Sequence, residues 1–389
     1  MGTIQNRYET FIIVLAALFN SVAGIVVDLY APCLPEIGNE LHISSVVMQN
    51  TISASIIGYA CGQLFFGILC DWKGRKLSII IGLVLFVIAS SLAVGANSLT
   101  ALLTARILQG FAAGACQVVA RAALIDEVKG HRFTIAVVYL STAFALGLIL
   151  GPYVGAVVQH SLSWRWNFVI YAIYSFILLV IASIWMRESL AKENNRSPSE
   201  TFTNYKVILA NKQFISSFIQ LGSCFIAFTM WNQVGPFIIK HSLNKSEVYF
   251  GKTALLAGLS YLAGTFLNRF LISKSSMNWR LNLGTIIFIS GITILLMQPS
   301  FIPLRLVIGL MLITFAQGVT FPNVLSHAMA IFPKMAGLSA SLQGAGMLLI
   351  GFIGLSLISF IHIDSGMTLG IIYLMIFMIS ITSRLISYK

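Results

Sequence analysis

A single carboxylate, Asp28, lies well inside an apolar stretch of this chain, and Tyr30, Pro32 and Pro35 follow it closely. A carboxyl group in hydrocarbon is costly unless it binds a proton, pairs with a cation or faces water, so an isolated one is a candidate functional group. If the helix continues past Asp28, Pro32 leaves the backbone carbonyl of Asp28 without a hydrogen bond. We therefore predict that Asp28 binds a proton or a cation; the alternative is a buried acid with only a structural role.

Other polar side chains and glycines recur inside the apolar stretches at intervals of three or four residues. These are Arg106, Gly110, Gly114, Gln117 and Arg121; Asn20, Gly24 and Asp28; and Gln317, Thr320, Asn323 and His327. Each series occupies one face of a helix. Such faces are expensive against lipid, so they are expected to line a cavity or a bundle interior. The glycines can instead serve as notches that let helices pack closely.

The composition indicates an integral membrane protein. The chain is 58% hydrophobic and only 9% charged, with a mean hydropathy of +0.90. Its net charge of +12 does not indicate a nucleic-acid partner, because most of the 24 Lys and Arg residues fall in the termini and loops of one side. This bias predicts that both termini are cytoplasmic.

Twelve apolar stretches are long enough to cross a bilayer, which predicts an all-α membrane protein. The first, which carries Asp28, is interpreted as a retained helix and not a signal peptide. The expected spans are 10–34, 46–69, 77–96, 98–122, 134–159, 166–186, 213–239, 249–272, 281–298, 303–327, 337–361 and 366–384. A long polar segment, 187–212, separates a six-helix bundle over 1–186 from a second over 213–389. This arrangement favours alternating access around a site between the bundles.

Several other classes of function are disfavoured. The five cysteines are not spaced as a disulfide framework or a metal site, and no phosphate-binding Gly-x-x-x-x-Gly-Lys-Ser/Thr sequence is present. We therefore expect no cofactor, no metal and no use of ATP. The histidines outside the tenth span lie at loops or span edges without catalytic partners, which argues against a membrane-embedded enzyme. No filter-like sequence indicates a channel.

Five motifs, in order along the chain, resemble those of the major facilitator superfamily, and within it the drug:proton antiporters of the Bcr/CflA type. They are Asp28–Ile37 (D-x-Y-x-P-x-x-P-x-I), Gly67–Lys76 (G-x-x-x-D-R-x-G-R-R), Arg106–Gly110 (R-x-x-Q-G), Gly147–Gly155 (G-x-x-x-G-P-x-x-G) and Phe321–Asn323 with Ala336, Gly337 and Ser339–Ser341 after it. The resemblance covers nearly the whole chain. It implies twelve helices in two six-helix bundles.

The resemblance also implies roles for individual residues. Asp28 would carry the coupled proton, and Arg106 would influence its ionisation. The fifth-helix motif, Gly147, Gly151, Pro152 and Gly155, would kink and tightly pack a helix between the halves. A cytoplasmic latch would consist of Gly67, Asp71, Gly74, Arg75, Lys76 and Asp126. In it, Asp71 would accept from the N-terminus of a facing helix and Arg75 would pair with Asp126.

The substrate cavity is expected between the two bundles. Its candidate residues are Asn20, Gly24, Tyr30, Gln109, Gln117, Trp231, Asn232, Gln233, Gln317 and Asn323. The chain also departs from the family pattern. Trp72 replaces an arginine of the loop motif, Ala156 replaces a glycine of the fifth-helix motif, and the stretch 231–236 differs from the usual seventh helix. The joint 273–276 contains no acid, so any second copy of the latch is expected to have decayed.

The sequence therefore favours a monomeric secondary transporter of the cell inner membrane. It would export small amphipathic compounds, drugs or metabolites, in exchange for protons. The alternative is a transporter, in either direction, of an anionic metabolite or a carboxylate-type siderophore, because the spans carry three cations, Arg106, Arg121 and Arg269, against one acid. Its partners would be the small-molecule substrate, protons and the lipid bilayer.

Overall fold

The computed structural model describes residues 2–189, 205–332 and 336–387, and every regular element in these residues is helical. Twelve of the helical segments are long and apolar enough to cross a membrane, which confirms the predicted class. The N-terminal half contains α1 (Gly2–Asp28), η1 (Ala31–Cys33), α2 (Leu34–Glu40), α3 (Ser45–Lys73), α4 (Arg75–Val94), α5 (Leu99–Glu127), α6 (Gly130–Ser161) and α7 (Trp164–Trp185).

The C-terminal half repeats the same plan. It contains α9 (Lys212–Phe237), η2 (Ile238–Ser242), α10 (Glu247–Leu271), α11 (Met277–Leu296), α12 (Pro303–Ile331), α13 (Ala336–Ile358) and α14 (Gly366–Ser387). Most helix ends lie within a few residues of the expected spans. The connecting segment was expected over 187–212; residues 190–204 of it lie outside the described residues, and 205–209 are helical.

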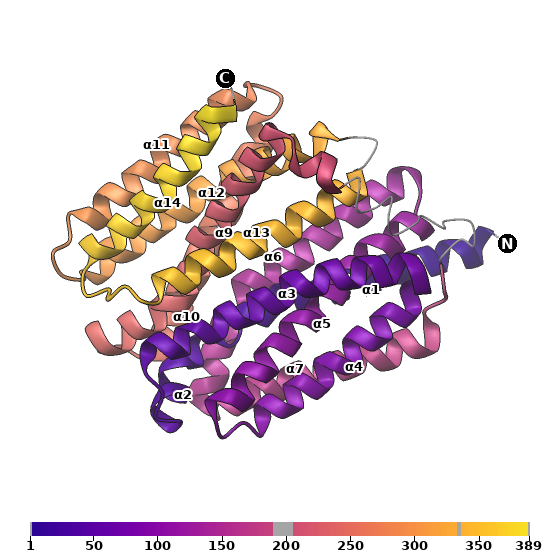
Figure 1. The fold of residues 1–389 in the computed structure, drawn as a ribbon, viewed down its shortest axis with the longest axis horizontal. Helices are drawn as coiled ribbons and strands as arrows, with labels where there is room; N and C mark the ends of the chain where they lie inside the picture. The colour runs from indigo at the N-terminus through magenta and orange to yellow at the C-terminus, as the bar shows by residue number, and fades with distance from the viewer. Residues whose placement is uncertain (1, 190–204, 333–335, 388–389) are drawn as a thin grey trace.

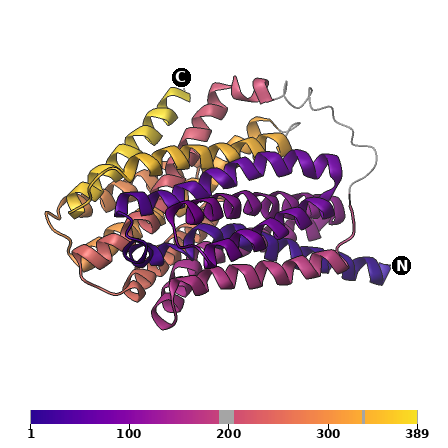
Figure 2. The same cartoon turned by 60° about the horizontal axis from the view of Figure 1, so that its bottom comes forward.

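The two halves form two bundles that pack side by side (Figure 1). Within the first bundle α3 packs on α5, α1 on α6 and α4 on α7, and within the second α10 packs on α12 and α11 on α12 and α14. Two helix pairs form most of the contact between the bundles, α3 with α13 and α6 with α10, and α9 also contacts α2 and α3. Figure 2 shows α13 lying along α3 from a second direction.

Glycines set the closest helix contacts in corresponding places of the two bundles. A Cβ atom on Gly110 of α5 would lie 1.9 Å from the carbonyl oxygen of Ser55 on α3. In the second bundle, a Cβ atom on Gly318 of α12 would lie 2.1 Å from the carbonyl oxygen of Tyr261 on α10. Gly114 likewise faces the α3 backbone. The glycines of the fourth span are therefore packing notches, the alternative that their spacing left open.

The first span is broken, in contrast to the continuous helix considered from the sequence. Helix α1 ends at Asp28, a short 3-10 turn covers Ala31–Cys33, and α2 begins at Leu34. Pro32 and Pro35 lack an N–H group and cannot continue the helical hydrogen bonds, while the N–H of Cys33 donates to the carbonyl of Tyr30. Asp28 therefore lies at a helix end, next to irregular backbone.

Candidate functional site

Asp28 is buried at the boundary between the two bundles. Its side chain is 1% exposed, and its Oδ1 accepts a hydrogen bond of 2.5 Å from Nδ2 of Asn232. Asn232 belongs to α9 of the C-terminal bundle, so this contact joins the halves. The second oxygen, Oδ2, is buried and has no hydrogen-bond partner among the described residues. A buried carboxyl with an open oxygen has a position at which a proton can bind.

Arg106 is fully buried in the N-terminal bundle, close to Asp28 but not paired with it. Its guanidinium donates to the carbonyl of Val26 at 2.8 Å, to Oε1 of Gln109 at 2.8 Å and to Oγ of Ser55 at 3.1 Å. The guanidinium also lies 4.5 Å from the ring centre of Tyr30. These contacts fix a positive charge beside the last turn of α1 without an ion pair to Asp28 among the described residues.

The partners of Arg106 are themselves held in place. Nε2 of Gln109 donates to Oγ of Ser90 at 2.9 Å, and the hydroxyl of Tyr30 is 2.8 Å from the hydroxyl of Thr51. This network connects α1, α3, α4 and α5 around one guanidinium. It fixes the position of the charge, because each acceptor has its own support.

The glycines of the fifth-helix motif bring α6 against the end of α1. Gly147 packs on Gly24, and a Cβ atom on Gly151 would lie 3.4 Å from the Cβ of Asp28. At Gly155 an added Cβ would lie 1.8 Å from the carbonyl oxygen of Leu29. Only glycine permits that approach. The expected tight packing is therefore present at the break that follows Asp28.

The same helix reaches the other bundle. Pro152 lies inside α6, and its carbonyl faces Gly251 of α10, where an added Cβ would lie 3.3 Å away. The methyl group of Ala156 also packs on Gly251. Helix α6 thus lies between α1, which carries Asp28, and α10 of the second bundle. This contact therefore joins α6 to the second bundle.

Three of the residues expected in the substrate cavity have packing roles in the N-terminal bundle. Nδ2 of Asn20 donates to the carbonyl of Leu140 at 2.9 Å, which ties α1 to α6. Gly24 faces the α6 backbone. Gln117 accepts a hydrogen bond from Gln63 of α3. Tyr30 and Gln109 hold Arg106, as described above.

The remaining five candidates are spread over the C-terminal bundle. Trp231 packs against an aromatic ring of α10, and Gln233 donates to a backbone carbonyl of α13 at 2.9 Å. Asn232 contacts Asp28, Gln317 lines a separate pocket inside the bundle, and Asn323 binds an arginine. The structure therefore does not bring the ten side chains together in one cavity, and their role in substrate binding stays a prediction.

The loop motif, Gly67–Lys76, forms the expected contact between Arg75 and Asp126. Nε of Arg75 is 2.7 Å from Oδ2 of Asp126, and its NH1 donates to the carbonyl of Cys70 at 2.8 Å. Asp71 differs from the expectation. Its side chain is 75% exposed and lies 3.3 Å from Arg75, and no contact with the N-terminus of a facing helix is present among the described residues. Asp126 is thus the closer partner of the arginine.

Glu188 is a part of this site that the sequence motifs did not identify. Its two carboxylate oxygens accept from the backbone N–H groups of Arg75 at 2.8 Å and Lys76 at 3.1 Å. Ser189 donates to Asp126 at 2.9 Å. The acid therefore occupies the N-terminus of α4, where the helix dipole favours negative charge. In the sequence, Glu188 is recognisable only as an acid just after the sixth span. It lies too far along the chain from Arg75 for residue spacing to predict their contact.

A second arginine anchor is present in the C-terminal bundle, where the joint 273–276 contains no acid and the second copy of the latch was expected to have decayed. NH1 of Arg280 donates to the carbonyl of Ser275 at 2.6 Å, as Arg75 does to Cys70. Its Nε and NH2 donate to Oδ1 of Asn323 at 3.1 and 3.0 Å. The anchor remains although its acceptor is a neutral amide.

Comparison with known proteins agrees with this architecture. A family model described as the Major Facilitator Superfamily matches residues 14–357. The chain is 26% identical to a chloramphenicol resistance protein of Acinetobacter baumannii, over 82% of this chain and 78% of that one. It is 23% identical to multidrug resistance protein D of Escherichia coli, over 88% and 86%. The fold matches a crystal structure of a D-xylose-proton symporter with a TM-score of 0.79, at 15% identity over 98% of each chain.

Proposed function

The chain belongs to the Major Facilitator Superfamily of transporters, and we propose that it exports small amphipathic compounds in exchange for protons. The observation that carries the proposal is the hydrogen bond from Asn232 to Asp28. In this contact Asp28, the one carboxylate that is buried among the described residues, meets the opposite bundle. A proton on Asp28 therefore changes a contact that the bundles must break when they move apart.

Three hydrogen bonds between described residues join the two bundles, and they support a coupled movement. Besides Asp28 with Asn232, they are Asn50 with Ser359 at 3.1 Å and His160 with Glu247 at 2.9 Å. The last two lie at the ends of their helices away from the chain termini. The bundles are thus held together at that end, and opening it requires these contacts to separate.

Ionisation of Asp28 would control that opening. An ionised carboxylate accepts a charge-assisted hydrogen bond from Asn232, which holds the end closed until substrate binds. After opening, a proton from the outside binds Asp28, and the neutral acid is less costly to bury again. Release of that proton to the inside would restore the starting state. This sequence exchanges one substrate leaving for a proton entering.

The names of two relatives and the contacts of Arg106 support this substrate class. Two relatives are named for resistance to chloramphenicol and to multiple drugs, which supports compounds of that kind. An anionic substrate is disfavoured, because the buried guanidinium of Arg106 already donates hydrogen bonds to Val26, Gln109 and Ser55.

We also propose that the protein lies in the inner membrane as a monomer, with both termini cytoplasmic.

Transport into inverted membrane vesicles tests the proposal. With an imposed proton gradient, labelled chloramphenicol should accumulate in vesicles that carry the wild-type chain and not in vesicles that carry Asp28→Asn, which cannot bind and release a proton. Glu36→Gln is the matched control, because this nearby carboxylate is exposed. Parallel cationic, neutral and anionic compounds define the substrate charge. Gradient-driven accumulation by Asp28→Asn would rule the mechanism out.

A further inference from the structure

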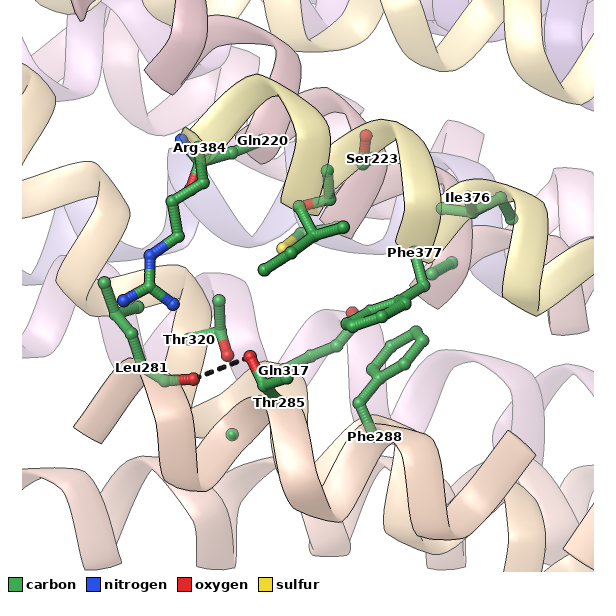
Figure 3. Close-up of a pocket in the computed structure, with 15 residues that line it drawn as sticks. Gln220, Ser223, Leu281, Thr285, Phe288, Gln317, Thr320, Ile376, Phe377 and Arg384 are labelled. Atoms are coloured by element: carbon green, nitrogen blue, oxygen red, sulfur yellow. Dashed lines mark hydrogen bonds between the residues drawn. The ribbon is translucent and has the colours of Figure 1, made fainter. Parts of the chain in front are cut away.

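A pocket of about 50 Å³ lies inside the C-terminal bundle, among α9, α11, α12 and α14. Figure 3 shows its lining side chains around an open space. None of them belongs to the N-terminal bundle, so the pocket is separate from Asp28 and from the boundary between the halves. It requires its own explanation.

One end of the pocket is polar and positively charged. Arg384, in the last turn of α14, is the only charged residue among those that line it, and none of the lining residues is acidic. Arg384 extends from α14 toward Leu281 and Thr320 (Figure 3). Its NH2 also donates to Asn282 of α11 at 3.2 Å, which holds the side chain between the two helices. A guanidinium in this position binds carboxylate or phosphate oxygens.

A buried amide adds a second donor. Gln317 of α12 lines the pocket, is 3% exposed, and its Nε2 has no hydrogen-bond partner among the described residues. An unpaired buried donor is costly, typically by about 1–3 kcal/mol. Thr285 and Thr320 provide hydroxyl oxygens nearby. An acceptor bound in the pocket would satisfy Gln317.

The other end of the pocket is apolar. The rings of Phe288 and Phe377 stack there, with centres 5.6 Å apart and an angle of 21° between the planes. Ile376 continues this surface. An alkyl chain fits against such side chains. The pocket therefore changes from cationic to apolar along its length, like an amphiphile with an acidic head group.

The pocket reaches partly exposed residues of α11 and α14. Thr285 on α11 and Ser380 and Ile381 on α14 line the pocket and are only half-buried. The outer faces of both helices are apolar and exposed, for example at Ile286 and Ile379. A ligand dissolved in the membrane can enter sideways at this seam. Basic pockets between membrane helices bind acidic lipid head groups elsewhere.

We propose that this pocket binds an anionic amphiphile from the bilayer, with its acidic head group on Arg384 and Gln317 and its alkyl chain against Phe288 and Phe377. The site is separate from Asp28 and does not depend on the proposed proton coupling, although it includes Gln317, which was expected in the substrate cavity.

Photolabelling of the full-length protein in nanodiscs tests this proposal. The probes are diazirine-bearing dodecanoate at alkaline pH, the matched diazirine-bearing dodecanol, and a diazirine-bearing phosphatidylglycerol. The dodecanoate should label peptides of α11, α12 or α14 that line the pocket, and the alcohol should label them much less. Labelling by phosphatidylglycerol at the same peptides would identify a phospholipid as the natural source, and labelling by dodecanoate alone a free acid; both support the site.

Variants make the test specific. Arg384→Gln and Gln317→Leu should each reduce dodecanoate labelling, by about tenfold for the arginine, because a charge-assisted hydrogen bond is lost. Arg269→Gln removes an exposed arginine of the same bundle and should leave labelling unchanged. Gel filtration and thermal melting check that each variant is folded. Equal labelling by the alcohol, or labelling unaffected by both pocket variants, would overturn the proposal.

Discussion

Gly74 lies so close to Glu188 that a Cβ atom on Gly74 would be 2.2 Å from the carboxylate oxygen Oε2. Its φ of +103° is also one that other residues rarely adopt. The carboxylate uses this space to reach the N–H groups of Arg75 and Lys76. Gly74 of the loop motif is therefore needed to leave room for Glu188, the acid that follows the sixth span.

Gly74→Ala should destabilise the protein by about 1–3 kcal/mol, since it strains the backbone and displaces Glu188. Thermal melting in detergent measures this effect. Gly67→Ala is the matched control, because this glycine belongs to the same motif and has no atom within 4 Å of an added Cβ. Equal melting temperatures for the two variants would contradict the role of Glu188.

Asp126→Asn should slow turnover more than Asp71→Asn, with substrate affinity changed only a few fold in each. Asp126 contacts the largely buried Arg75 at 2.7 Å, whereas Asp71 is mostly exposed at 3.3 Å, and exposed ion pairs contribute little. Initial transport rates at saturating substrate give the comparison. A larger loss in Asp71→Asn would contradict this ranking of the two acids.

Exchanging the two residues of the bundle-to-bundle contact should restore part of the coupling. Asp28→Asn alone should abolish transport driven by a proton gradient, while the double variant Asp28→Asn with Asn232→Asp returns one carboxyl and one amide to the same hydrogen bond. Gradient-driven uptake into vesicles measures the recovery. The single variant Asn232→Asp is the control. No recovery, with both proteins folded, would mean that the carboxyl must belong to α1.

Arg106→Lys should destabilise the protein by about 2 kcal/mol or more. Lysine keeps the positive charge but not the planar set of donors that serves Val26, Gln109 and Ser55. Denaturation in detergent measures the change. Arg305→Lys, at an exposed arginine of α12, should change stability by no more than about 0.5 kcal/mol. Similar values for both would contradict a structural role of the buried guanidinium.

The positive-inside bias predicts that both termini are cytoplasmic, and the twelve candidate spans require both on one side. A reporter that is active only in the periplasm, fused after Lys389, should therefore be silent. The same reporter fused after Leu162, in the joint between α6 and α7, should be active. Activity after Lys389 would contradict the predicted orientation.

Much of the fold was predictable because its causes are local. The length of each apolar stretch sets the span, and the structure confirms twelve of them to within a few residues at most ends. The break after Asp28 was not predicted. Pro32 and Pro35 can either kink a membrane helix or end it, and neighbouring helices decide between the two. Here the backbone of α6 at Gly155 packs against the break.

The site was only partly predictable. Asp28 and Arg106 stood out because charged groups in hydrocarbon are rare, whichever helices surround them. Among the polar candidates, the sequence could not distinguish residues that bind substrate from residues that pack helices. A buried amide such as Asn20 looks identical in sequence in either role. Gln317 illustrates this, since its stripe indicated the central cavity and the structure places it in a pocket of one bundle.

The sequence by itself determined the class of the protein, its spans and the few residues too costly to place in lipid without a reason. The tertiary structure alone decided which of these side chains come into contact. It brought Asn232 to Asp28, Glu188 to the start of α4 and Arg280 to Asn323, from positions far apart along the chain. The physical reason is that hydrophobic length acts on each segment separately, whereas hydrogen-bond partners across helices depend on rotation and depth, which packing of all the helices sets together.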